Sequence, residues 1–289
     1  MRRTHPERAI VQRLEAEAIA PDGAHVLVAC SGGPDSVALA SLIARLAPAH
    51  GWSVVLGHVN HGLRVSAWQD EAVVAAVGAR LGAVVRVEPL AEPVAGRDRA
   101  EASLRDRRYA ALAAMATREG VRAVLTAHTA EDQTESVLLA LFRGTGLRGL
   151  SGMPARRKLA GKVELVRPLL GVSRSELHAE LGASALPYVR DPSNADLALR
   201  RNAVREALEG LRQQFPRLDE AVARCAAIAR DELAPSERGL ARRRLRDALQ
   251  QEAGLTDVPF ERIEAVLAAR RGRVYIKHGV EVSVVSRKA

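Results

Sequence analysis

The chain has 289 residues, enough for about two domains, and 47% of them are hydrophobic, so a sizeable core can form. Only 3% are aromatic, so that core must be built mainly from Ala, Val and Leu. The net charge of +9 suits a polyanion such as a nucleic acid, although a surplus of Arg can also reflect genome composition or a need for stability.

No apolar run approaches the roughly 20 residues that a membrane-spanning helix needs, so no membrane partner is expected. The charged N-terminus lacks the apolar stretch of a signal peptide, which predicts a cytoplasmic location. The two cysteines, Cys30 and Cys225, do not form a metal-binding pair, and Cys30 is predicted to be a small buried core residue. A homodimer is among the assemblies that the sequence leaves open.

The first half of the chain alternates short β-branched runs with longer patterns of helical periodicity. Strands are predicted at 24–30, 53–60, 83–88 and 123–128, and helices at 36–47, 69–81, 101–119 and 131–142. This alternation predicts an α/β fold in which a doubly wound parallel sheet carries helices on both faces. Ligands of such sheets bind at the carboxyl ends of the strands, so the chemistry is expected just after residues 30, 60, 88 and 128.

The pattern changes beyond residue 142. A glycine-containing loop at 144–152 and a short apolar run at 163–169 precede helices predicted at 173–181, 197–213, 218–233, 238–252 and 259–269. Alternating residues at 273–277 and 281–286, with Gly279 between them, predict a hairpin. We therefore expect a main domain at 1–215, followed at 216–289 by a helical linker and a small α/β appendage.

One hexapeptide follows the first strand and opens the first helix: Ser31, Gly32, Gly33, Pro34, Asp35 and Ser36. Its glycines permit positive φ and a close approach of a ligand, and its N–H groups at a helix N-terminus suit a pyrophosphate. An ordinary P-loop would need a lysine, and a dinucleotide fingerprint a third glycine. An acid beside phosphates requires a divalent cation, so Asp35 predicts Mg²⁺ as a cofactor. A capped glycine turn is the structural alternative.

The hexapeptide resembles the PP-loop of the ATP pyrophosphatases, whose fold is that of the adenine nucleotide α-hydrolases. The resemblance implies that ATP is cleaved between its α and β phosphates and that the substrate is adenylated. GMP synthetase, argininosuccinate synthetase, RNA thiolases and tRNA(Ile)-lysidine synthetases share this loop. The loop alone does not choose among them.

A second polar run, His58-Val59-Asn60-His61-Gly62-Leu63-Arg64, ends the second strand. Its side chains could contact phosphate or a nucleobase, or the run could be a polar turn. It resembles the corresponding run of the tRNA(Ile)-lysidine synthetase family. The resemblance implies that His58, Asn60 and His61 bind ATP and that Arg64 approaches tRNA.

A third pattern places Glu101, Arg105 and Arg108 on one face of a predicted helix, just before Tyr109. By itself this spacing is equally typical of a solvated face with ion pairs. The same family has a similar pattern before a Tyr. The resemblance implies that Arg108 contacts the lysine substrate, while Arg105 and Glu101 shape the site and Arg105 reaches tRNA.

A fourth motif combines a histidine with two acids: His128 ends the fourth strand, and Asp132 and Glu135 follow on the next helix. A carboxylate pair suits an ammonium group or a metal, but acids are also common at helix N-termini. The family has a histidine and paired acids here, which implies that Asp132 and Glu135 hold the lysine. This chain departs from the family at Glu131, where Asp is usual, and at Thr129 and Ser136.

Two basic stretches complete the pattern. A glycine-rich loop carries Arg143 and Arg148, and could be a mobile anion-contacting loop or a simple linker. Beyond the turn Arg190-Asp191-Pro192-Ser193-Asn194, the basic residues Arg200, Arg201 and Arg205 occupy a predicted helix. In the family this second stretch closes the active site and approaches tRNA, and the C-terminal appendage helps to hold the tRNA. The resemblance is dense over about residues 24–210.

The resemblance implies one reaction. ATP adenylates the C2 oxygen of the wobble cytidine in a tRNA(Ile) with a CAU anticodon, and the ε-amine of free L-lysine displaces AMP to give lysidine. Asp35, His128, Asp132 and Glu135 are the candidate catalytic residues, and either His128 or an acid of 131–135 could accept the proton. The alternatives are an RNA thiolase of the same loop family, a non-catalytic basic RNA-binding protein and amide formation on a small molecule.

Overall fold

A computed structural model describes residues 5–16, 19–60, 67–90, 97–190, 200–233, 237–255, 258–269, 272–277 and 279–284. By their internal contacts these residues fall into two compact units. The first comprises Met1–Leu139 with Gly152–Ala223, and the second comprises Ala140–Ser151 with Arg224–Ala289. The break near Ala223 falls later than the boundary near residue 215 that the sequence suggested.

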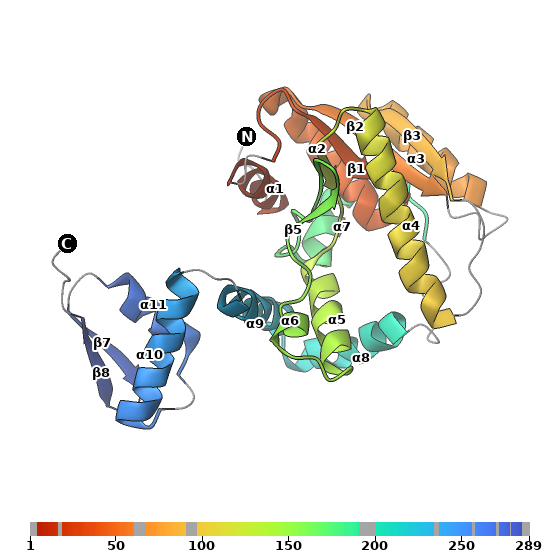
Figure 1. Ribbon diagram of the computed structural model, residues 1–289. Coiled ribbons are helices and arrows are strands. Elements are labelled where there is room, and N and C mark those ends of the chain that lie inside the picture. Colours follow the sequence, from red (N-terminus) through yellow and green to blue (C-terminus); the bar gives the residue numbers. More distant parts are fainter. Residues whose placement is uncertain are drawn as a thin grey trace. The chain divides into compact units, whose positions relative to one another are not determined.

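The first unit is built on a sheet whose described strands run in the order β3-β2-β1-β4-β6-β5 (Figure 1). Four of its strands match the predicted runs: β1 is His25–Ala29, β2 Ser53–Asn60, β3 Val84–Pro89 and β4 Ala123–Leu125. With β6, Val163–Val166, they pair in parallel, while β5, Arg156–Ala160, is an antiparallel edge strand. The predicted parallel sheet is confirmed, but β5 was not foreseen because its Arg- and Lys-rich sequence lacks an apolar period.

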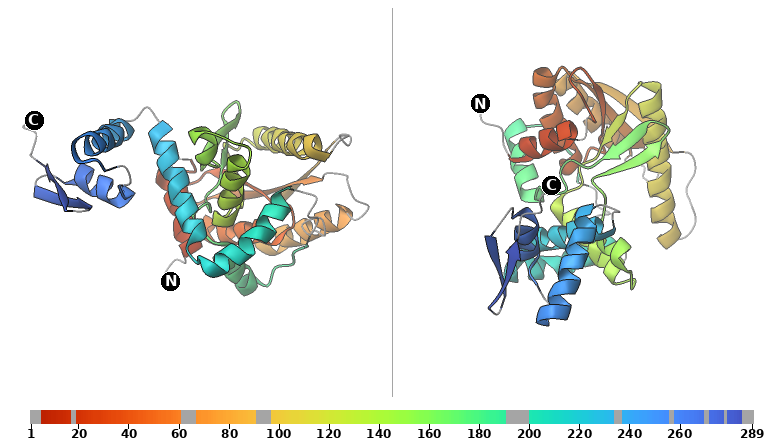
Figure 2. Two further views of the ribbon diagram at one scale, coloured as in Figure 1. Left: turned by 90° about the horizontal axis from the view of Figure 1, so that it is seen from below. Right: turned by 60° about the vertical axis from the view of Figure 1, so that its left-hand side comes forward.

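Helices cover both faces of this sheet, as the alternation of the strands requires (Figure 2). Along β1, Val26 and Val28 pack toward one side and Leu27 toward the other. The first side is covered by α1, α2, α3 and α7, which are His5–Ala16, Pro34–His50, Ala67–Leu81 and Arg174–Ser184. The second is covered by α4, Arg97–Arg118, through Tyr109, Leu112 and Met115. The doubly wound prediction is therefore confirmed, whereas α1 was not predicted.

Further helical segments lie between β4 and β5 or follow α7. They are α5 at Ala130–Leu141, the single turn α6 at Leu147–Leu150, α8 at Arg200–Gln214 and α9 at Leu218–Leu233. In the second unit α10, Glu237–Ala253, and α11, Phe260–Ala268, pack on a hairpin of β7, Gly272–Lys277, and β8, Val280–Val284. Its small core contains Leu249, Ile263, Val266 and Ile276. The predicted hairpin is present, with Gly279 at a φ of +82°.

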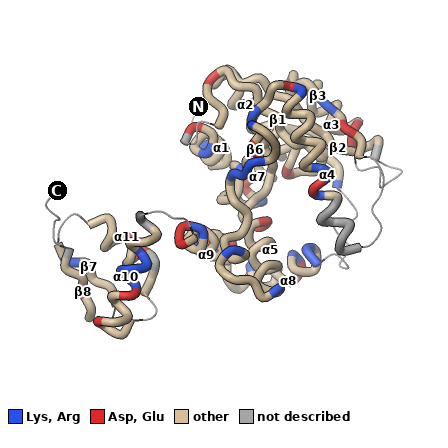
Figure 3. The backbone as a smooth tube through the Cα atoms, viewed as in Figure 1, with Lys and Arg blue, Asp and Glu red and all other residues tan. Residues whose placement is uncertain are grey.

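The charged residues are spread over both units (Figure 3). No helix in the described ranges combines the length and the apolar character needed to cross a membrane. Because ligands of such sheets bind at the carboxyl ends of the strands, the active site is sought at the residues that follow β1 and β4.

Candidate active site

The loop Ser31–Ser36, here called the glycine loop, turns the chain from β1 into α2. Gly32 has a φ of +85°, and a Cβ there would lie 3.3 Å from Cγ2 of Val189. Gly33 has an ordinary φ of −73° and is the N-cap of α2, with Pro34 in the first turn. Of the two glycines, only Gly32 is required by the backbone conformation.

The two serines of this loop mainly hold its shape. The hydroxyl of Ser36 donates to the carbonyl of Gly33 at 2.9 Å and accepts from the N–H of Ser31 at 3.1 Å. Ser36 is buried, whereas Ser31 is exposed and its hydroxyl lies 3.2 Å from that of Ser36. The Ser31 hydroxyl is thus the one that a ligand can reach, and Ser36 fixes the turn.

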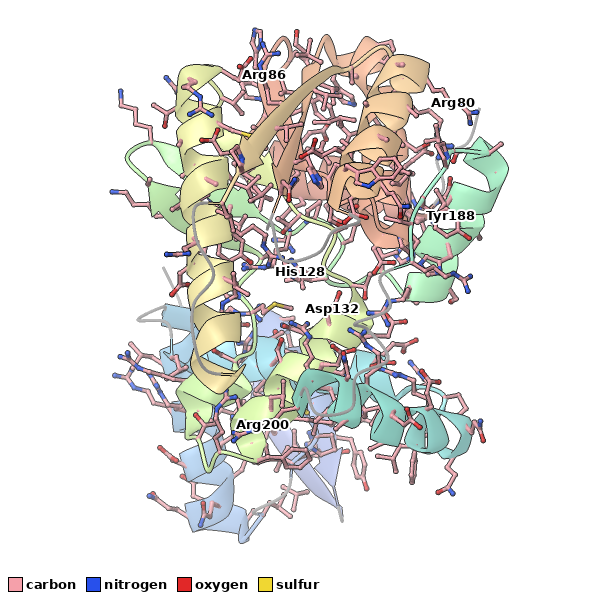
Figure 4. The ribbon with its side chains drawn as sticks, turned by 90° about the vertical axis from the view of Figure 1, so that its right-hand side faces the viewer. Arg80, Arg86, His128, Asp132, Tyr188 and Arg200 are labelled. Atoms are coloured by element: carbon pink, nitrogen blue, oxygen red, sulfur yellow. The ribbon has the colours of Figure 1, made fainter. Side chains whose placement is uncertain are left out.

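A cavity of about 390 Å³ lies between this loop and the end of β4. That volume is within the range of small-molecule sites. Its wall includes Ser31, Gly33, Pro34, Asp35 and Ser36 of the glycine loop, and also Arg108, His128, Asp132 and Arg205 from the other predicted motifs. Motifs that are distant in the sequence therefore meet at one edge of the sheet, where His128 and Asp132 lie together in Figure 4.

Asp132 and Glu135 are held in a cluster of ion pairs with Arg174, Arg201 and Arg205, here called the carboxylate–guanidinium cluster. Glu135 has no exposed surface, and its two oxygens accept from Nε of Arg201 at 2.7 Å and Nε of Arg205 at 2.8 Å. Oδ1 of Asp132 accepts from Arg201 at 3.2 Å and from Arg174 at 3.3 Å. The predicted acid pair is thus brought together, with arginines on both carboxylates.

The cluster also serves the fold. Oδ2 of Asp132 accepts from the N–H of Thr129 at 2.9 Å, so one oxygen caps α5 while the other faces the guanidinium groups. Burial pushes the pKa of Asp132 upward, but the guanidiniums of Arg201 and Arg174 outweigh it and hold that pKa below its usual value. Asp132 is therefore a charged acceptor at neutral pH.

His128 is partly buried beside these charges. Burial, aided by nearby arginines and opposed by Asp132, lowers the pKa of His128 to about 3. Its Nδ1 lies 3.0 Å from the hydroxyl of Thr126, which itself donates to the carbonyl of Val166. When the Thr126 hydroxyl donates to Val166 it accepts from Nδ1, and Nε2 of a neutral His128 is then an acceptor.

Glu131, which stands where Asp is usual in the family that the sequence resembles, binds the backbone at the start of α7. Both of its carboxylate oxygens accept from the backbone N–H of Arg174, at 2.8 and 2.9 Å. This N–H is one of the unpaired donors in the first turn of α7. Glu131 thus anchors the start of α7 against α5.

Asp35 has two nitrogen-bearing neighbours that sequence reasoning did not identify. Oδ1 of Asp35 lies 2.6 Å from Nε2 of His178, and Oδ2 lies 3.4 Å from Nε of Arg174. Both neighbours belong to α7 and line the cavity. Nothing in the local sequence of α7 links it to an acid that is 139 positions away from Arg174.

The donor set around Asp35 fits a magnesium ion that arrives with phosphates. Mg²⁺ typically takes one or two carboxylates together with the oxygens of its nucleotide. Within the described part of the chain, no group of three His, Cys, Asp or Glu side chains could hold a metal by itself. Asp35 offers one carboxylate at the cavity wall, so the remaining ligands would have to come from a substrate and water.

A second cationic group surrounds Tyr109, another wall residue. The guanidinium carbon of Arg157 lies 4.6 Å from the centre of the Tyr109 ring, and that of Arg108 lies 5.4 Å from it. Burial raises the pKa of Tyr109, but Arg167 and Arg108 outweigh it and lower that pKa overall. Neither Arg157 nor Arg167 was predicted. Arg157 lies in the unforeseen strand β5, and Arg167 directly follows β6.

Several predicted residues lie elsewhere. His58 is buried and its Nδ1 donates to the carbonyl of Cys30 at 2.9 Å, while Asn60 donates to Glu71 of α3. Neither is part of the cavity wall. The β2 residues that line the cavity are Gly57 and Val59, and successive side chains of a strand point to opposite faces. Arg105 and Arg200 are exposed, and Arg143 and Arg148 are exposed in the second unit. His61, Arg64, the Glu101 side chain and residues 191–199 lie outside the described residues.

A family model described as a PP-loop domain matches residues 4–211. The chain belongs to the PP-loop domain family. A curated tRNA(Ile)-lysidine synthase from Salinispora tropica is 47% identical over 211 residues, which are 72% of this chain and 63% of that protein. One from Ralstonia nicotianae is 44% identical over 205 residues, which are 70% of this chain and 44% of that protein. This PP-loop chain thus spans less than two thirds of the length of these relatives.

Among solved structures, a U34-tRNA thiolase from Methanococcus maripaludis matches 76% of the chain, and the match covers 77% of that protein, with a TM-score of 0.65. The two sequences are 16% identical, so this likeness establishes the PP-loop fold and not the reaction. The expectation of a doubly wound, mostly parallel sheet of the PP-loop kind is confirmed.

Proposed function

We propose that the chain catalyses the ATP-dependent attachment of L-lysine to C2 of the wobble cytidine in a tRNA(Ile) with a CAU anticodon. The observation that carries this proposal is a cavity whose wall includes both the glycine loop and Asp132 of the acid pair of α5. The relatives named tRNA(Ile)-lysidine synthase support the choice of reaction, and the net charge of +9 suits a nucleic-acid substrate.

In the first step the glycine loop binds the phosphates of ATP, and the C2 oxygen of the cytidine attacks the α phosphate. The bond between the α and β phosphates breaks, and pyrophosphate leaves. A magnesium ion held by Asp35 and the phosphates would neutralise charge on the leaving group. The N-terminus of α2 and the hydroxyl of Ser31 favour the same charge.

In the second step the ε-amine of lysine attacks C2, the bond from C2 to the adenylate oxygen breaks, and AMP leaves. Asp132 suits the ammonium form as it binds, because its carboxylate lines the cavity, while the buried Glu135 contributes negative charge through the arginines that both acids share. The amine must give up a proton, to an acid of 131–135 or to water, before it attacks. A His128 with a pKa of about 3 is a weak base for this purpose, so we assign it the role of a neutral hydrogen-bond acceptor.

The RNA thiolase alternative is less well supported. Cys30 lies in the cavity wall, but burial raises the pKa of its thiol and keeps it from becoming a thiolate. Cys225, the second cysteine, belongs to the second unit. A thiolation reaction would therefore lack a reactive sulfur at the glycine loop.

The decisive experiment incubates the chain with ATP, Mg²⁺, L-lysine and a tRNA(Ile) transcript that carries the CAU anticodon. We expect AMP and pyrophosphate in equal amounts and a cytidine whose mass increases by one lysine minus water. A transcript with uridine at the wobble position serves as the control and should release neither product. Formation of pyrophosphate without any lysine-containing nucleoside would contradict the proposal.

A further inference from the structure

Arg174 contacts the acids of two different subsites. Its Nε lies 3.4 Å from Oδ2 of Asp35, which is in the glycine loop. Its Nη2 lies 3.3 Å from Oδ1 of Asp132 and 4.0 Å from Oε1 of Glu135, which are the acids assigned to the amine. One guanidinium group thus joins the proposed magnesium ligand to the proposed ammonium site.

The backbone of Arg174 is fixed while its side chain can turn. Ser173 caps α7 in a reciprocal arrangement with Glu176, and Glu131 accepts the N–H of Arg174. The side chain of Arg174 is 22% exposed and forms part of the cavity wall. Its guanidinium can therefore move between partners by rotation about its side-chain bonds, with α7 left in place.

Within this one network of ion pairs, the acids and the guanidinium groups are equal in number before any ligand binds. Asp35, Asp132 and Glu135 supply three negative charges, and Arg174, Arg201 and Arg205 supply three positive ones. A nucleotide with magnesium adds net negative charge, and a lysine side chain adds positive charge. The two ligands shift this balance in opposite directions, so each favours binding of the other, provided that one guanidinium moves toward the phosphates.

Arg174 is the group that is placed to make that move. Magnesium at Asp35 would displace it from that carboxylate, and the adjacent phosphates offer it charge-assisted bidentate hydrogen bonds. Its departure would remove one cation from Asp132 and make room for an ammonium group. Arg201 and Arg205 would stay on Glu135, which is buried and needs its partners.

We infer that Arg174 couples nucleotide binding to amine binding, so that ATP opens the lysine subsite. This inference rests on the proposed function, since it takes ATP and lysine as the two ligands. Arg174 would then do more than contact phosphates. This one side chain would determine that ATP binds before lysine.

The test measures binding of α,β-methylene ATP with Mg²⁺ to the full chain by calorimetry, with and without saturating L-lysine. The methylene bridge prevents cleavage, so only binding is observed. In the wild type we expect lysine to tighten nucleotide binding at least about fivefold, and the nucleotide to tighten lysine binding by the same factor. In Arg174→Gln both ligands should still bind, but each should bind with the same affinity whether or not the other is present.

Two further variants separate coupling from charge and from nucleotide contact. Arg174→Lys keeps the charge but has no planar fork to contact two carboxylates, so its coupling should also fall. If Arg174→Gln fails to fold, Arg174→Lys is used for the same measurement. Of the three acids, His178 contacts Asp35 and not the acid pair of α5, so His178→Gln affects the nucleotide side only. This variant should weaken nucleotide binding while the coupling factor stays near that of the wild type.

The outcomes distinguish the two proposals. A wild type that binds neither nucleotide nor lysine overturns the proposed function, and this inference with it. A wild type that binds both ligands independently overturns the inference alone. Coupling of equal size in the wild type and in a folded Arg174 variant also overturns it, whereas loss of coupling in the Arg174 variants but not in His178→Gln supports it.

Discussion

The glycine loop and the carboxylate–guanidinium cluster share one cavity, but they are assembled in different ways. The loop is shaped by contacts within six residues, such as the bonds of Ser36 to Ser31 and to Gly33. The cluster joins α5, α7 and α8, and Glu135 meets Arg201 and Arg205 across 66 and 70 positions of sequence. The comparison teaches that a backbone-built phosphate site is local, whereas a site made of paired side chains depends on the tertiary fold.

The largest effect should come from the loop, where function and stability can be separated. Asp35→Ala removes the acid assigned to magnesium, and we expect pyrophosphate release to fall at least about a thousandfold. Asp35 is partly exposed, so the midpoint of thermal unfolding should stay the same. The exposed Asp247→Ala on α10 is the matched control and should keep full turnover. Normal turnover of Asp35→Ala would exclude its assigned role.

In the cluster, loss of one acid should instead destabilise the protein. Glu135→Gln leaves two guanidinium groups without their buried partner, and we expect the free energy of unfolding to fall by about 3 kcal/mol. Urea denaturation followed by circular dichroism measures this. Glu220→Gln removes the exposed ion pair with Arg217 and should shift the denaturation midpoint far less. Equal shifts for the two variants would show that the cluster adds no more than a surface pair.

The pH dependence of stability tests His128. Its folded pKa of about 3 is below the unfolded value near 6.5, so the unfolded state takes up its proton first as the pH falls. This histidine therefore removes stability below about pH 6.5, and its contribution should reach about 2 kcal/mol at pH 5. His128→Asn should lose less stability than the wild type between pH 7 and 5. Parallel curves for both proteins would place the pKa of His128 near its ordinary value.

The smallest effect compares the two glycines. Gly32→Ala forces a side chain into a φ of +85° beside Val189 and should cost about 1–2 kcal/mol of stability. Gly33→Ala has an ordinary φ and no atom closer than 3.4 Å to the new Cβ, so it should fold normally. Thermal unfolding of both variants provides the measurement. A greater loss for Gly33→Ala would contradict the geometry of the loop.

Much of this architecture could be predicted. The β-branched runs located β1, β2 and β3 to within a few residues, and the periodic segments located α2, α3 and α5. The charged edge strand β5 was missed because it lacks an apolar period, whereas the helix α1 was missed although Ile10, Val11 and Leu14 form one apolar face. His58 and Asn60 were expected in the ATP site, but the pleat of β2 directs them away from the cavity wall.

By itself, the sequence determined the parallel sheet, the loop at its first strand end and the presence of an acid pair after β4. These features are local, because they follow from periodicity, glycine conformations and the residues adjacent to a strand end. Only the tertiary structure decided that Arg174 and His178 of α7 meet Asp35, and that Arg201 and Arg205 cover Glu135. Such pairs are set by how helices pack, and no spacing along the chain records which surface each guanidinium will face.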